Sequence, residues 1–415
     1  MALRPRPALC PHQGFGNEPP GGATSRSVCA AVDVAQGSKL GRELVGPDDM
    51  LNGVQDPSGD PPPLVWPSFL RPTPPFQLVY LDLNHWISLA QAATGHSDGA
   101  RFVQVLAACR EARRAGVAIF PLSNSHYVEI SKIKDPRQRQ DLAHVIEELS
   151  DFITLLSPAA LKKIELDAVL QEPLGSLPSR WNNYPLVGYG VGFSLGRPMR
   201  PQLVGRDGED VTEQWRQLPG GDELLRDAAV GLERAVLAGP TDAEVPQLRA
   251  DGWDPEAAWG VAESRAQEER EQALRIDGAT GKNWRKGRLR DMMCARETLI
   301  ELREAFEATF KERGNTSLDL WFSDRDKMRR LVRSMPSSEV AIELKTAMHR
   351  NAQRACVWEP NDVVDMDALS LAVPYCDIVV TEQHAHHVLR AARLHERMDT
   401  VLLRDLTELP ANLSA

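Results

Sequence analysis

Several features that would place the chain in a membrane or a secretory pathway are missing from its sequence. No uninterrupted apolar run reaches about 18 residues, the length that a membrane-spanning helix needs. The N-terminal stretch MALRPRPALCPHQG has arginines but no apolar segment behind them, so a secretory signal is not indicated. The six cysteines include no C-x-x-C pair, and we expect them to be reduced thiols. These absences favour a cytoplasmic protein.

The composition is that of an ordinary globular chain with an excess of acid. Of the 415 residues, 42% are hydrophobic and 26% are charged, which excludes collagen-like, coiled-coil and wholly disordered chains. The length predicts two to three domains. Because the formal net charge is −10, the protein as a whole repels polyanions. Any contact with nucleic acid therefore requires a local basic patch.

Turn-forming residues are concentrated at the N-terminus. Residues 1–75 hold 14 of the 30 prolines and 9 of the 29 glycines. Proline removes a hydrogen-bond donor and restricts the residue before it, so this composition is unsuited to helices and central strands. We expect residues 1–75 to be mostly flexible or extended.

An α/β pattern begins directly after this segment. The apolar run Leu78–Leu81 is typical of a strand covered on both faces, and Gly116–Ser123 reads as a second such strand. Strand patterns return only near the end of the chain. We therefore expect a discontinuous α/β domain formed by residues 76–170 and 335–415, with a parallel sheet and helices on both faces. Residues 171–334 read as an insertion that is first loop-rich and then helical.

Acidic residues follow the predicted strands. Asp82 ends the first strand, Glu129 lies in the helix after the second, Asp365 lies at the start of a later helix, and Glu382 follows a late strand. Since the carboxyl ends of parallel strands form one crevice, these side chains are expected to converge. Converging carboxylates need a counter-charge, and oxygen-only ligands suit Mg²⁺ or Mn²⁺. Such an ion can activate water for phosphodiester hydrolysis.

These residues resemble the PIN-like family of metal-dependent ribonucleases. The motif YLDLNHW supplies Asp82 and a small polar residue, Asn84, while PLSNSHYVE supplies Glu129. Asp365 lies sixteen positions before Thr381, as in the family's helix and strand. The resemblance covers about 165 residues. It implies a PIN-like three-layer fold and a Mg²⁺- or Mn²⁺-dependent endoribonuclease in which Asn84 and Thr381 orient the ligands; the family is also widely used in toxin and defence modules.

The motif departs from the family at one position, because Gln383 stands two residues after Thr381 where the family has aspartate. The fourth acidic ligand is then Glu382, Asp377 or Asp367, or one metal is lost. The alternative function is a PIN-like fold with a degraded site that acts as an RNA-binding or protein-interaction scaffold.

One basic stretch suits contact with RNA. The segment KNWRKGRLR has no acid and contains Lys282, Trp284, Arg285 and Lys286, a composition that allows phosphate contact and base stacking. An equally good interpretation is a solvated helix start with Trp284 packed inward. DNA as the substrate, a protein partner and a homo-oligomer all stay open at this point. No membrane partner is expected.

Overall fold

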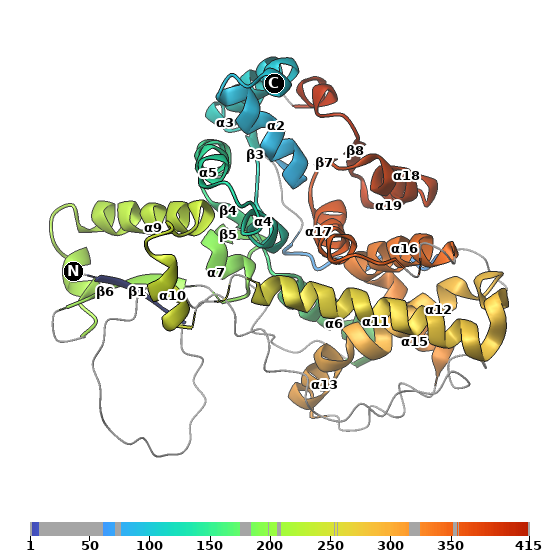
Figure 1. Ribbon diagram of the computed structural model, residues 1–415. Coiled ribbons are helices and arrows are strands. Elements are labelled where there is room, and N and C mark those ends of the chain that lie inside the picture. The colour runs from blue at the N-terminus through green and yellow to red at the C-terminus, as the bar shows by residue number, and fades with distance from the viewer. Residues whose placement is uncertain are drawn as a thin grey trace.

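The apolar run Leu78–Leu81 forms a strand, as the sequence predicts. In the computed structural model it belongs to β2 (Gln77–Leu81), which pairs in parallel with β3 (Ala118–Ile119) and with β7 (Ile378–Val380). β8 (Val401–Leu403) extends this parallel sheet beyond β7, giving the order β3-β2-β7-β8. Figure 1 labels β3, β7 and β8 of this sheet. Strands from the two ends of the chain thus share one sheet, and the predicted discontinuous α/β fold is confirmed at this level.

The structure describes most of the chain from residue 76 onward. The described residues are 2–7, 61–70, 76–174, 184–197, 199–205, 209–252, 254, 256–314, 324–351, 355 and 357–413. Most of residues 1–75, for which the sequence predicts flexibility, lies outside these ranges.

A further strand extends the sheet on the side of β3. β4 (Ile153–Leu155) lies beside Leu122, whose backbone N–H donates to the carbonyl of Ile153 at 2.9 Å. β5 (Val187–Tyr189) then pairs with β4 antiparallel. From β2 the chain therefore runs outward through β3 to β4, and it later runs the other way through β7 to β8. The carboxyl edge between β2 and β7 is thus a topological switch point, where open α/β sheets bind ligands.

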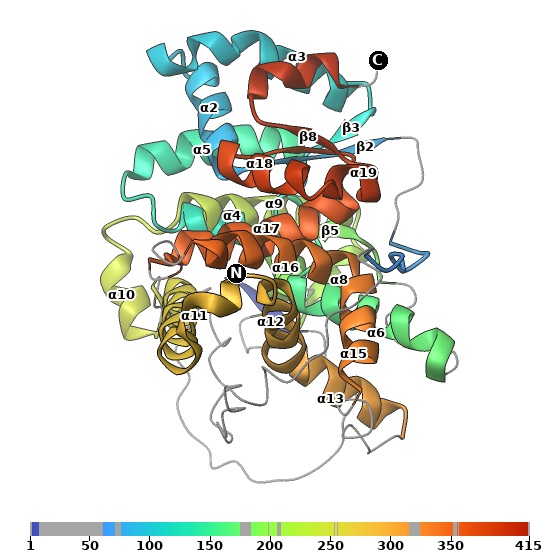
Figure 2. The same cartoon turned by 90° about the vertical axis from the view of Figure 1, so that its right-hand side faces the viewer.

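Helices cover both faces of the sheet, so every position of β2 from Leu78 to Leu81 is buried. Val79 and Leu81 join one core cluster, while Leu78 and Tyr80 point to the other side and join a second cluster. Figure 2 shows α3 and α17 on opposite sides of the strands. Elements against the first face are α2 (Leu83–Ala93), η1 (Ser97–Phe102), α3 (Val103–Arg114), α5 (Pro136–Ser150) and η5 (Leu406–Ala411). Elements against the second are α6 (Pro158–Leu174), α17 (Pro360–Tyr375), α18 (Gln383–Ala391) and α19 (Leu394–Met398).

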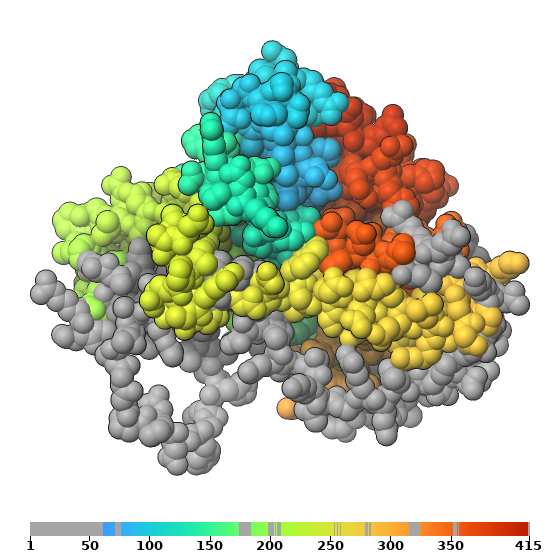
Figure 3. Space-filling model, viewed as in Figure 1, coloured from blue at the N-terminus to red at the C-terminus, as the bar shows by residue number. Residues whose placement is uncertain are grey.

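The second half of the insertion is helical, as predicted, and builds a core of its own. Its elements are α11 (Ala257–Thr280), η2 (Gly281–Arg285), α12 (Leu289–Arg296), the π-helical turn η3 (Glu297–Glu301), α13 (Arg303–Glu312) and α15 (Arg325–Ser334). Their apolar residues pack with the end of α6 and with α16 (Pro336–Arg350). In Figures 1 and 3 these helices, yellow to orange, lie on the side of the molecule away from α2 and α3.

The first half of the insertion contains more regular structure than the predicted loop. The predicted loop-rich part holds β5 and α7 (Gly190–Ser194), and Gly190 has a φ of 79°, which favours glycine. The other elements are β6 (Met199–Val204), which pairs with β1 (Ala2–Pro7), α8 (Thr212–Arg216), α9 (Gly221–Ala238) and α10 (Val245–Ala250). α9 packs on α5, and its Leu237 enters the first core cluster.

Residues 61–70, part of the segment expected to be flexible or extended, pack on the folded domain. The backbone N–H of Val65 donates to the carbonyl of Ser334 at 2.8 Å, and Leu70 is fully buried. The ring of Trp66 meets that of Tyr375 edge-on, with centroids 5.6 Å apart. Within the part of the chain that the structure describes, no helix is both long enough and apolar enough to cross a bilayer.

Candidate metal centre

Asp82 stands at the point where β2 ends and α2 begins. Its backbone N–H donates to the carbonyl of Val380 in β7 at 3.1 Å, which fixes it at the carboxyl edge of the sheet. Its side chain caps α2, because Oδ1 accepts a hydrogen bond from the N–H of Leu83 at 2.9 Å. The carboxylate therefore lies at the switch point between β2 and β7.

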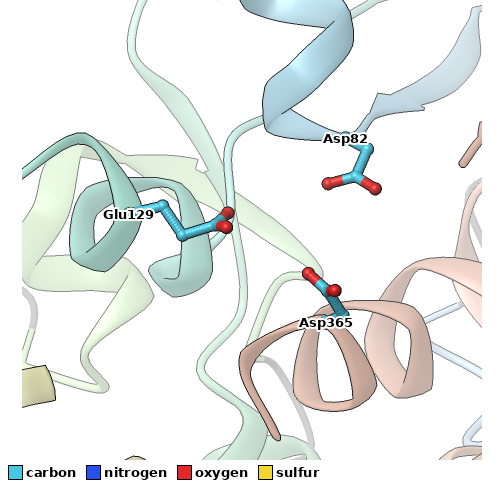
Figure 4. A group of neighbouring side chains, drawn as sticks. All are labelled: Asp82, Glu129 and Asp365. Atoms are coloured by element: carbon cyan, nitrogen blue, oxygen red, sulfur yellow. The ribbon is translucent and has the colours of Figure 1, made fainter. Parts of the chain in front are cut away.

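Two helices bring the other carboxylates to the same place. Glu129 comes from α4 (Asn124–Ile130), and Asp365 comes from the second turn of α17 rather than from a helix start as predicted. Ser125 Oγ donates to the carbonyl of Val364 at 3.1 Å, so α4 and α17 touch next to these acids. Each of Asp82, Glu129 and Asp365 offers an oxygen within 4.8 Å of the others, and Figure 4 shows the three carboxylates pointing toward one another. Their expected convergence is confirmed.

A buried histidine holds two of these elements in register. His126 Nδ1 accepts a hydrogen bond from the N–H of Ser123 at 2.9 Å, while His126 Nε2 lies 2.8 Å from the carbonyl oxygen of Leu81. Because Nδ1 accepts, Nε2 carries the proton and donates to Leu81. Burial lowers the pKa of His126 to about 4, which keeps the ring neutral. The ring thus links the residue before Asp82 to the start of the helix that carries Glu129.

Burial and nearby negative charge raise the pKa values of all three carboxyl groups. Burial, aided by repulsion from Glu382, raises the pKa of Asp82 to about 6. Burial and then the charge of Asp82 raise the pKa of Glu129 to about 7, although Lys132 opposes the rise. Burial and then the charges of Asp82 and Glu129 raise the pKa of Asp365 to about 8. A neighbouring positive charge would relieve all three.

The chemistry of these residues fits a hard divalent cation. Among the described residues, no lysine or arginine nitrogen lies within 4.0 Å of any of the three carboxylates, so no direct ion pair neutralises them. The donors are oxygen atoms only, which suits Mg²⁺ or Mn²⁺ better than zinc. At the same edge the buried hydroxyl of Thr381 has no hydrogen-bond partner. Asp82, Glu129 and Asp365 are the residues that would hold the ion.

The other predicted acids lie elsewhere. Glu382 is exposed at the start of α18 and acts on Asp82 and Asp365 through its charge, but it is not part of the close group. Asp367 binds Arg265, with an Nη2–Oδ1 distance of 3.1 Å, because two residues along a helix turn a side chain to another face. Asp377 precedes β7 and accepts from the N–H of Leu78 at 2.7 Å, at the amino edge of the sheet. The prediction that Asp367 or Asp377 is a metal ligand is therefore wrong.

The two predicted supporting residues differ in position. Thr381 is fully buried directly after β7, and its N–H donates to the carbonyl of Leu403 at 3.0 Å. Asn84 is exposed in the first turn of α2. The structure thus keeps Thr381 within the sheet edge, while Asn84 faces solvent beside it.

The predicted RNA-contact stretch is largely structural. Trp284 is buried, and its indole N–H donates to Asp277 Oδ1 at 2.7 Å. Arg285 also pairs with Asp277, and its Nε donates to the carbonyl of His349 at 2.8 Å. The prediction that these two residues contact RNA is wrong, because each would have to give up its hydrogen bond to the largely buried carboxylate of Asp277. Lys286 is exposed, and the side chain of Lys282 lies outside the described residues.

Sequence reasoning missed a buried ionic cluster between the sheet domain and the insertion. Lys345 Nζ lies 3.0 Å from Glu297 and 3.1 Å from Glu301, and Lys162 lies 3.3 Å from Glu297. Together with the Arg265–Asp367 pair they line a small cavity between α6, α16 and α17. Opposite charges balance in it, so it holds the insertion to the core rather than offering a charged site.

The fold and the site were compared with known proteins. No family model matches the chain, and no curated protein or solved structure shows a significant similarity to it.

Proposed function

We propose that the protein is a divalent-metal-dependent endoribonuclease with a PIN-like fold. The observation that carries the proposal is the convergence of Asp82, Glu129 and Asp365 at the switch point of a parallel sheet. When bound, Mg²⁺ or Mn²⁺ would supply a Lewis acid that polarises a phosphoryl oxygen and lowers the pKa of water. The resemblance of these acids and their order to the PIN-like family supports RNA as the substrate.

The chain's own residues provide the frame for this chemistry. Asp82 is fixed by its cap on α2, and His126 fixes the spacing between the strand end and α4. The three carboxyls have raised pKa values without a cation, so they favour binding one over remaining ionised together. Because each carboxylate is half-buried, few water molecules compete with the phosphodiester for a place at the site.

The test is cleavage of a mixed single-stranded and structured RNA with Mn²⁺, with chelator as the control. Asp82→Asn should abolish cleavage and leave the fold intact, because it removes one ligand charge while keeping the size of the side chain. Asp377→Asn, at the amino edge of the sheet, is the matched variant that should keep activity if it folds. Cleavage that survives both chelation and Asp82→Asn would rule out the proposal.

One observation keeps the second candidate function in view, a scaffold that binds RNA without cutting it. The fourth acid, Glu382, lies outside the close carboxylate group, so three carboxylates rather than four converge. Wild-type protein that binds RNA and never cuts it, with either Mg²⁺ or Mn²⁺, would favour the scaffold.

A further inference from the structure

A lysine lies beside the three carboxylates without being paired to them. Lys132 follows α4 and lies three residues after Glu129. Its Nζ donates to Asn361 Oδ1 at 2.9 Å. Asn361 lies four residues before Asp365 on α17, and such a spacing places both on one face of the helix. The ammonium group is therefore about one helical turn from Asp365, next to the site.

The insertion holds this ammonium in place. Lys132 Nζ lies 3.5 Å from the centroid of the ring of Trp259, which belongs to α11. The face of an indole ring attracts a cation, and this contact does not neutralise the positive charge as a carboxylate partner would. An ammonium has three donors, and Asn361 takes one of them. The exposed side chain of Lys132 thus keeps hydrogen-bonding capacity toward solvent.

The net negative charge around the three carboxylates explains why a site for nucleic acid needs a cation such as Lys132. Three ionised carboxylates and one divalent cation leave one net negative charge, and Glu382 and Asp362 add more around Asp365. A phosphodiester would be repelled by this surrounding. Among the described residues whose charges act most strongly on Glu129, Lys132 is the one cation.

We propose that Lys132 binds a phosphate of the RNA backbone next to the bond that is cut, and that Trp259 of the insertion positions it. The inference rests on the proposed nuclease function and deepens it. It gives the helical insertion a part in substrate binding, because the insertion supplies the ring that orients the lysine. It also gives the acidic protein the local positive charge that nucleic-acid binding requires.

The experiment compares variants in both cleavage and binding. Lys132→Gln should raise the KM for a single-stranded RNA by about tenfold, the effect of losing one charge-assisted hydrogen bond. Lys132→Arg should restore most of it. In an Asp82→Asn background that does not cut, Lys132→Gln should reduce the slope of log binding constant against log salt by about 0.7, as expected for one lost phosphate contact on a single strand.

Two further variants separate positioning from folding. Trp259→Leu removes the ring face and should raise KM by a smaller factor, while Trp259→Phe should keep most of the wild-type KM. Lys134→Gln, an exposed lysine two residues away, is the matched control and should change neither KM nor slope. Melting curves of all variants show whether each is folded.

The outcomes distinguish this inference from the nuclease proposal. If the wild type cuts RNA and Lys132→Gln has the same KM and salt slope, the role of Lys132 is refuted and the nuclease stands. If the wild type never cuts but Lys132→Gln still lowers the salt slope, the nuclease proposal fails and the phosphate contact stands. An equal effect of Lys132→Gln and Lys134→Gln would show general charge attraction and overturn the inference.

Discussion

Replacing Asp365 by asparagine should stabilise the protein when no metal is present. Burial and repulsion raise the pKa of Asp365 from 3.8 to about 8, so ionising it in the folded state is costly. For a carboxyl standing alone, such a displacement amounts to about 6 kcal/mol above pH 8. In the wild type, protonation of Glu129 and Asp82 already relieves part of the repulsion. We therefore expect Asp365→Asn to raise the free energy of unfolding by about 1–3 kcal/mol. The new amide can donate to the remaining carboxylates.

The size of this stabilisation depends on pH in a defined window. Between pH 3.8 and about 8 the folded state holds a proton on Asp365 that the unfolded state has lost, so wild-type stability falls as pH rises. The advantage of Asp365→Asn should therefore be absent below about pH 4 and complete above about pH 8. Asp367→Asn is the matched control on the same helix, and it should destabilise the protein at neutral pH because it leaves Arg265 without its closest partner.

Metal should counteract this difference in stability. Mn²⁺ at a hundred times its dissociation constant would stabilise the wild type by about 2.7 kcal/mol. Asp365→Asn should gain much less from the ion. The assay is urea unfolding of both proteins at pH 5 and pH 8, with chelator or with Mn²⁺. If Asp365→Asn is less stable than the wild type at pH 8 without metal, or if Mn²⁺ stabilises both equally, the reasoning is refuted.

Three other substitutions test the surroundings of the site. His126→Ala should cost about 2–4 kcal/mol and weaken Mn²⁺ binding, since it leaves the carbonyl of Leu81 and the N–H of Ser123 unpaired; calorimetry with and without Mn²⁺ measures both effects, and unchanged Mn²⁺ affinity would contradict the positioning role. Glu382→Gln should change Mn²⁺ affinity far less than Asp365→Asn does, because Glu382 acts from outside the close group; an equal loss by titration would make it a ligand. Trp284→Phe should lower the melting temperature without changing RNA affinity, and a specific loss of RNA binding in gel shifts would restore its predicted contact.

The strand ends could be predicted from sequence because local pattern decides them. A continuous apolar run closed by an acid is typical of a buried strand, and the structure has such a strand with Asp82 at its end. α4 begins directly after Ser123, a residue type that often caps the start of a helix. The pairing of β2 with β7 agrees with the expected discontinuous domain, although almost 300 residues separate the two strands.

The rotation of a helix and the position of a strand explain why Asp367 and Asp377 were wrongly predicted as metal ligands. Asp365 and Asp367 lie two residues apart on α17, and only the rotation of that helix determines which of them faces the site. Asp377 lies directly before β7 and Thr381 directly after it, so the strand places the two residues at opposite edges of the sheet. Sequence alone gives strand ends to within a few residues, which is too coarse for this choice.

The tertiary partners of several charged and aromatic side chains could not be predicted. Trp284 and Arg285 have the composition of a nucleic-acid contact, but Asp277 and the carbonyl of His349 engage them. Likewise, the sequence suggests that Lys345 is a surface residue. In the structure it pairs with Glu297 and Glu301 of the π-helical turn. Charged side chains are usually solvated, so a buried network appears only when tertiary packing is known.

A crystal of the protein grown with Mn²⁺ and measured at the manganese absorption edge tests the metal centre most directly. The account predicts an anomalous difference peak within bonding distance of carboxylate oxygens of Asp82, Glu129 and Asp365, and no such peak in an Asp82→Asn crystal treated in the same way. A wild-type crystal without a peak at this position, or with equal peaks in both proteins, would contradict it.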